Sequence, residues 1–184
     1  MIGAGAWPLL GLLCACSSAQ GSPDATPNVP PRLDPGERLV EGEGFRVIVP
    51  ASWKDLPDLQ PSGTRGTTVG DPRQAVFFSV VHTTVTGQSD PATAARSFLT
   101  ELKQSLVDGG ASVRRWDLEE TPVGLRARAT VEQGEMRAEG VHLAVVDTAR
   151  VLHGFSADCL SKTIAPDPTC ERVLSSFDVT VKRP

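Results

Sequence analysis

The stretch LRARATVEQGEMRAEGVHLA, residues 125–144, decides the fold. Two β-prone segments flank Gln133-Gly134, and a glycine after a polar residue is typical of a tight hairpin turn. Three pairs face each other if these two residues form the turn: Val131 with Met136, Ala129 with Ala138, and Arg128 with Glu139. Because this register sets apolar against apolar and charge against counter-charge, the stretch predicts an antiparallel hairpin.

Further turns extend the hairpin into a meander over residues 112–158. Residues 120–124 and 147–149 contain turn-forming residues between β-prone segments. Upstream, residues 44–50 and 75–86 are predicted strands, the first ended by a proline and the second rich in Val, Phe and Thr. The Pro- and Gly-rich residues between these two strands predict a loop.

Two helices are predicted to begin at Asp-Pro pairs. Asp90 and Asp167 supply N-cap acceptors, and the proline after each occupies a helical position that needs no N–H. The first helix has one apolar face, made of Ala95, Phe98, Leu99, Leu102 and Leu106. The second runs to about Ser176 and leads into a last strand over residues 177–182. Two helices and six or seven strands around a mostly antiparallel sheet predict an α+β sandwich.

The two ends of this domain carry short motifs. Residues 44–54 read Gly-Phe-Arg-Val-Ile-Val-Pro-Ala-Ser-Trp-Lys, and residues 170–179 read Cys-Glu-Arg-Val-Leu-Ser-Ser-Phe-Asp-Val. They resemble the strand-Pro-x-x-Trp opening and the Ser-Phe-x-Val closing of the DcrB/PsbP-like families. The resemblance covers about residues 40–182 and implies an α-β-α sandwich. It also implies a binding or assembly module without shared catalytic residues, as in envelope lipoproteins and in proteins that cap photosystem II. We expect Trp53 to pack in the core.

The first residues, 1–15, are uncharged and largely apolar. This run is shorter than the roughly 20 residues of a membrane-spanning helix and predicts an export signal. Leu13-Cys14-Ala15-Cys16 then resembles the lipobox of bacterial lipoproteins. The resemblance implies cleavage before Cys16 and transfer of diacylglycerol to its thiol, which anchors the protein to a membrane. The alternative is an ordinary secretory signal followed by an incidental cysteine.

The next residues, 16–39, contain five prolines and no hydrophobic period. Such a composition predicts a disordered tether between the anchor and a domain at residues 40–184. Ser17 stands where many Gram-negative lipoproteins retained at the inner membrane carry Asp. The resemblance therefore points to the outer membrane, on its periplasmic side.

The remaining cysteines support export. Loss of Cys14 with the signal and lipidation of Cys16 leave an even pair, Cys159 and Cys170. We expect these two to form a disulfide, because export brings them into an oxidising compartment. The alternatives are two free thiols or half of a metal site.

Two histidines are the candidate metal ligands. A two-residue turn at Asp147-Thr148 sets His142 opposite His153, where ring nitrogens can bind zinc at about 2.0 to 2.1 Å. The alternative is that hydrogen bonds satisfy both rings. His82 joins them only if its strand is adjacent.

Other features argue against several activities. A net charge of −4 over 184 residues disfavours nucleic-acid binding. Ser156 lacks the closing glycine and the helix of a nucleophile elbow, and no zinc-protease, Walker or dinucleotide motif is present. Interleaved Arg and Glu in the meander predict surface salt bridges rather than a basic patch. We therefore expect an envelope protein that is not an enzyme, has no cofactor and binds a protein partner. The alternative is a small-ligand or metal-binding protein that uses His142 and His153.

Overall fold

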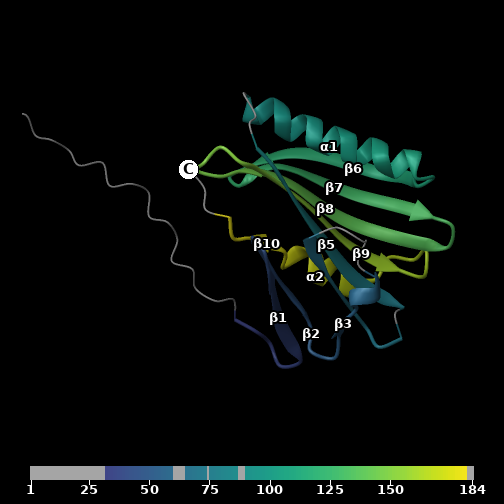
Figure 1. Ribbon diagram of the computed structural model, residues 1–184. Helices are drawn as coiled ribbons and strands as arrows, with labels where there is room; N and C mark the ends of the chain where they lie inside the picture. The colour runs from purple at the N-terminus through teal and green to yellow at the C-terminus, as the bar shows by residue number, and fades with distance from the viewer. Residues whose placement is uncertain (1–31, 60–64, 74, 87–89, 182–184) are drawn as a thin grey trace, which may run out of the picture. The chain divides into compact units, whose positions relative to one another are not determined.

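The computed structural model describes residues 32–59, 65–73, 75–86 and 90–181. The described residues form two antiparallel sheets and two α-helices (Figure 1). The chain is therefore a mixed α+β protein, as predicted. Within this part of the chain, no helix has the length and apolar character to cross a membrane.

The large sheet has seven strands in the order β3-β4-β5-β9-β8-β7-β6. Their bounds are β3 (Lys54–Asp55), β4 (Arg65–Gly70), β5 (Val76–Val85), β6 (Ser112–Thr121), β7 (Gly124–Gln133), β8 (Met136–Val146) and β9 (Leu152–Ser161). Strands β6 to β9 are the predicted meander, and β5 inserts between β4 and β9. The small sheet has the order β1-β2-β10 and consists of β1 (Glu37–Gly42), β2 (Phe45–Pro50) and β10 (Asp178–Val179).

Helix α1 (Pro91–Asp108) covers one face of the large sheet. It begins where predicted, because the Asp90 carboxylate accepts a hydrogen bond of 3.1 Å from the backbone N–H of Ala92. Leu99 is fully buried on its apolar face. That face packs on small and branched side chains of the sheet: Leu125, Ala127, Ala144 and Leu152.

The small sheet and helix α2 (Pro168–Ser175) lie on the opposite face. Asp167 caps α2 by accepting a 2.7 Å hydrogen bond from the backbone N–H of Thr169. The larger of the two cores lies here and contains Phe45, Val47, Phe78, Leu143, Phe155 and Val173. Trp53 is 5% exposed and belongs to this core, as predicted.

The disulfide between Cys159 and Cys170 is formed, which confirms the prediction. It joins the first turn of α2 to β9, and both cysteines are buried. The cross-link fixes α2 against the face of the large sheet that lies opposite α1.

Three strands were not expected. β1 takes residues 37–39 from the predicted tether and pairs with β2 through a two-residue turn at Glu43-Gly44, where Gly44 has φ +79°. β3 and β4 form where the Pro- and Gly-rich loop was predicted, and a short 3₁₀ turn, η1 (Pro57–Leu59), lies between them. Gly66 is required in β4 because a Cβ there would approach the Val80 carbonyl oxygen to 2.0 Å. The glycines that suggested a loop thus permit close strand pairing.

The β7–β8 hairpin forms, but its predicted register is wrong by two residues. Gly134 and Glu135 make the turn, so Gln133 pairs with Met136 and Val131 faces Ala138. Gly134 has φ +61°, the left-handed conformation that tight hairpin turns require and that glycine adopts without strain. A shift of two residues keeps every side chain on its predicted face, because side-chain direction alternates with a period of two.

Candidate functional site

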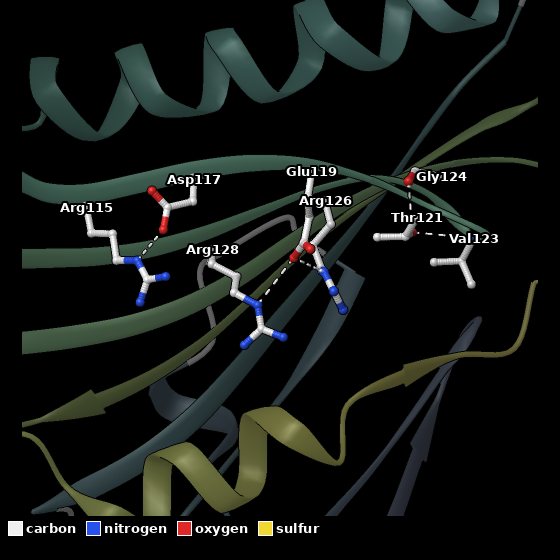
Figure 2. A network of polar contacts seen from close by, with 8 residues as sticks. All are labelled: Arg115, Asp117, Glu119, Thr121, Val123, Gly124, Arg126 and Arg128. Carbon is white, nitrogen blue, oxygen red and sulfur yellow. Dashed lines mark hydrogen bonds and ion pairs between the residues drawn. The ribbon is translucent and has the colours of Figure 1, made fainter.

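A groove of about 580 Å³ lies between α2 and strands β6, β7 and β8. Arg115, Arg128 and Arg137 line it from the sheet, and Glu171 and Leu174 line it from the helix. The groove lies here because the short helix α2 covers only part of the large-sheet face opposite α1. The rest of the face carries charged side chains (Figure 2).

Alternation along β6 and β7 gathers these charges on one face. Arg115, Asp117 and Glu119 point to the side of α2, and so do Arg126 and Arg128 from the neighbouring strand. Glu119 receives two arginines: Nε of Arg126 lies 2.6 Å and Nε of Arg128 lies 3.3 Å from its Oε1. The hydrogen bond from Arg126, followed by that from Arg128, lowers the pKa of Glu119. Arg115 likewise pairs with Asp117 through Nε.

Arg137 is the most fully paired arginine of the groove. Its guanidinium lies 2.6 Å from Oε1 of Glu139 and 3.7 Å from Oε1 of Glu132. Thr130 donates a further hydrogen bond of 2.7 Å to Oε2 of Glu139. The interleaved charges therefore form ion pairs, as the sequence predicts, rather than a continuous basic surface.

The predicted pair of His142 and His153 does not form. Five residues rather than two connect β8 to β9, so His142 faces Ser156 and His153 faces Val145. Asp147 stabilises this longer turn by accepting backbone N–H bonds of 2.8 Å from both Ala149 and Val151. The register moves by three residues, an odd number, which places the two histidines on opposite faces of the sheet. They cannot share a metal ion.

His153 pairs with His82 instead. β5 lies beside β9, and Nε2 of His82 is 3.1 Å from Nδ1 of His153. Nε2 of His153 lies 3.1 Å from Oδ2 of Asp147, and the His82 ring stacks on Phe155 at 4.5 Å. Burial, followed by the neighbouring His153, lowers the pKa of His82. Burial and the neighbouring imidazole therefore favour a neutral His82 in the core.

His142 lies beneath α1 and is completely buried. Its Nδ1 is 3.0 Å from the Ser156 hydroxyl, which donates a 2.8 Å hydrogen bond to Asp158, and its ring stacks on Trp116 at 5.1 Å. A serine and a histidine are thus in hydrogen-bond contact. Because the imidazole is inaccessible and Ser156 lies within β9 rather than at a strand-to-helix turn, we assign this cluster to the core.

The described residues contain no group of three or more His, Cys, Asp or Glu side chains arranged to hold a metal ion. Hydrogen bonds satisfy both ring nitrogens of His153, which agrees with the alternative interpretation of the sequence. His82 and His142 each bond through one ring nitrogen and stack on an aromatic ring, while Nδ1 of His82 and Nε2 of His142 have no hydrogen-bond partner in the described part of the chain.

The chain matches no known family model and no curated protein. Of the predicted site residues, Cys159 and Cys170 lie together beside the groove, and Cys16 lies outside the described residues. Sequence reasoning did not identify Arg115, Arg128 and Glu171 as groove residues. The alternating charges on β6 and β7 were a visible signal, but the position of α2 over them was not.

Proposed function

We propose that the protein is a lipid-anchored binding protein of the bacterial cell envelope, and that its domain holds a ligand or partner in the groove beside α2 without catalysing a reaction. The observation that carries the proposal is the Cys159–Cys170 disulfide. It fixes one wall of the groove to the sheet, and disulfides persist in the oxidising compartments that exported proteins reach.

The number and positions of the cysteines support a lipid anchor at Cys16. The chain has four cysteines, and the disulfide accounts for two of them. The other two, Cys14 and Cys16, stand within the four residues that resemble a lipobox. Attachment of two or three acyl chains at Cys16 would hold the protein at a membrane, whereas one chain binds only marginally. With Ser17 at the next position, we place the protein at the outer membrane, facing the periplasm.

The similarity of residues 44–54 and 170–179 to the DcrB/PsbP-like families agrees with this proposal. We propose a PsbP-like α-β-α arrangement in which α1 forms one outer layer, while α2 and the small sheet contribute the other. The resemblance implies a binding or assembly role, and the groove offers a place for it. We expect a protein partner of the envelope, and the groove would hold either a segment of that partner or a small ligand.

The anchor is tested by two matched variants of the full-length protein in a Gram-negative host. Cys16→Ser should shift the protein from the detergent phase to the aqueous phase in a Triton phase separation. Cys14→Ser, two residues away, should leave it in the detergent phase. The proposal fails if Cys16→Ser stays with the detergent, or if Cys14→Ser is the variant that releases the protein.

Membrane placement and partner are tested with the lipidated protein. Density fractionation of envelopes should place it with outer-membrane markers, and sedimentation with inner-membrane markers would contradict the assignment. Affinity capture from solubilised envelopes should recover a partner that a groove variant, Leu174→Arg, no longer retains. Equal recovery by wild type and variant would remove the groove from the proposal.

A further inference from the structure

Two arginines of the groove use only part of their hydrogen-bonding capacity. Arg115 and Arg128 each donate through Nε, to Asp117 and to Glu119. A guanidinium group has five N–H donors. Within the described part of the chain, the terminal nitrogens of both arginines donate no hydrogen bond.

Both groups remain accessible from the groove. The side chains of Arg115 and Arg128 are 58% and 53% exposed, and both line the groove. Figure 2 shows the two guanidinium groups on the side of the sheet that faces α2. Asp117 and Glu119 bind the two side chains at Nε, and the terminal nitrogens point away from β6 and β7.

The two arginines are diagonal neighbours on adjacent strands. Arg115 pairs with Thr130 across the ladder and Asp117 pairs with Arg128. Long side chains at such diagonal positions reach one another. Because each guanidinium presents a planar fork that matches a carboxylate or a phosphate, two forks at one site favour an oxyanion. Holding them in place beforehand reduces the entropy lost on binding.

The opposite wall carries one uncommitted negative charge. Glu171 is exposed on α2, and its carboxylate makes no hydrogen bond or ion pair with the described residues. The other acidic side chains of the groove are engaged, since Asp167 caps α2 and Glu139 binds Thr130 and Arg137. The charges available to a ligand are therefore two guanidinium groups on one side and one carboxylate on the other.

We infer that the groove binds a small zwitterion, with its oxyanion at Arg115 and Arg128 and its ammonium group towards Glu171. The inference rests on the proposed binding role and specifies its ligand class. A short peptide with free termini has this chemistry, and so does a phosphoethanolamine headgroup. A groove of about 580 Å³ lies within the size range of small-molecule sites. Leu174 and Val141 supply apolar surface between the charges.

The test is calorimetric titration of the full-length lipidated protein in a non-ionic detergent. The probes are dialanine, N-acetyl-dialanine, dialanine amide and phosphoethanolamine. We expect dialanine to bind, the amide to lose binding because it has no carboxylate, and the acetylated form to bind more weakly because it has no ammonium group. Tighter binding of phosphoethanolamine than of dialanine would support the charge arrangement and assign its source to a lipid headgroup.

Three variants locate the site. Arg115→Gln and Arg128→Gln should each weaken dialanine binding by roughly tenfold to a hundredfold, the usual effect of losing a hydrogen bond to a charged group. Arg114→Gln is the matched control, because Arg114 lies beside Arg115 on β6 and pairs with Glu132 of β7 but does not line the groove. Its affinity should stay at the wild-type value. Equal thermal unfolding of all variants would show that they are folded.

Glu171→Gln separates the two halves of the site. This variant should bind dialanine and N-acetyl-dialanine equally well, because the carboxylate that selects the ammonium group is gone. The inference is overturned if no probe binds at millimolar concentration, if Arg114→Gln weakens binding as much as Arg115→Gln, or if acetylation has no effect on the wild type. Each of these results leaves the Cys16→Ser experiment untouched, so failure of the ligand class is distinguishable from failure of the anchor.

Discussion

Reduction of the Cys159–Cys170 disulfide should loosen α2 and open one wall of the groove. The bond joins α2 to β9 across a sequence separation of 11 residues. A loop of this length restricts the unfolded chain by about 3 kcal/mol in the chain-entropy model. Both cysteines are buried beside Val173, so the folded state holds the bond in a packed environment.

The loss should be uneven across the structure. Helix α1 packs on the other face of the large sheet and has its own core around Leu99, so it does not depend on α2 for its contacts. Helix α2 has eight residues and buries only Cys170 and Val173. It should therefore open locally once the covalent link is removed, whereas α1 should open only with the whole domain.

Urea unfolding and amide hydrogen exchange measure the two effects. The oxidised and reduced forms of the wild type should differ by about 3 kcal/mol in the free energy of unfolding. Amides of α2 should lose more protection than those of α1, and dialanine should bind more weakly to the reduced form. A Cys159→Ala/Cys170→Ala variant should behave like the reduced protein. Identical unfolding of the oxidised and reduced forms, or equal loss of protection in both helices, would refute this reasoning.

Three further predictions follow from single positions. Gly154→Ala should destabilise the fold by roughly 1 to 3 kcal/mol, because its Cβ would approach the Phe98 ring to 2.3 Å, and Phe98→Ala in the same chain should recover part of the loss in thermal unfolding. The folded state lowers the pKa of His82 from 6.5, so the contribution of this neutral imidazole to the free energy of unfolding should be fully present above pH 6.5 and decrease as the pH falls below it. Urea unfolding as a function of pH should show this decrease in the wild type and a smaller one in His82→Gln. Asp167→Ala should cost about 1 kcal/mol by removing the N-cap of α2, and should increase hydrogen exchange in that helix.

Each prediction has a contradicting result. Wild-type stability of Gly154→Ala would show that α1 does not approach β9 closely. If the free energy of unfolding of His82→Gln decreased at low pH as much as that of the wild type, a group other than His82 would be responsible. If Asp167→Ala left both stability and exchange unaffected, the cap would make no contribution to the position of α2.

Both helices were predictable because their start signals are local. Asp90 and Asp167 cap helices within two residues along the chain, and the apolar face that contains Leu99 repeats with the helical period. The disulfide was predictable by counting cysteines. The meander was predictable because its turn residues lie between β-prone segments, although the choice between Gln133-Gly134 and Gly134-Glu135 was not.

The parts that failed depend on contacts between distant segments. His82 and His153 are neighbours because β5 inserts beside β9, a pairing of strands far apart in the sequence. β4 was not predicted because its glycines are typical of a loop, whereas in the structure they allow β4 to approach β5 closely. The groove exists because α2 docks over one part of a charged sheet face. None of these contacts between distant segments can be predicted from a periodic pattern within one segment of the sequence.

Mass spectrometry of the amino-terminal peptide tests the central claim of a lipid-anchored binding protein most directly. The first trypsin site after Cys16 is Arg32, so digestion of the envelope-purified protein should release one peptide of residues 16–32. Its mass should include diacylglycerol on the Cys16 thiol. A peptide that begins at another residue, or one that carries an unmodified Cys16 thiol, would contradict the account.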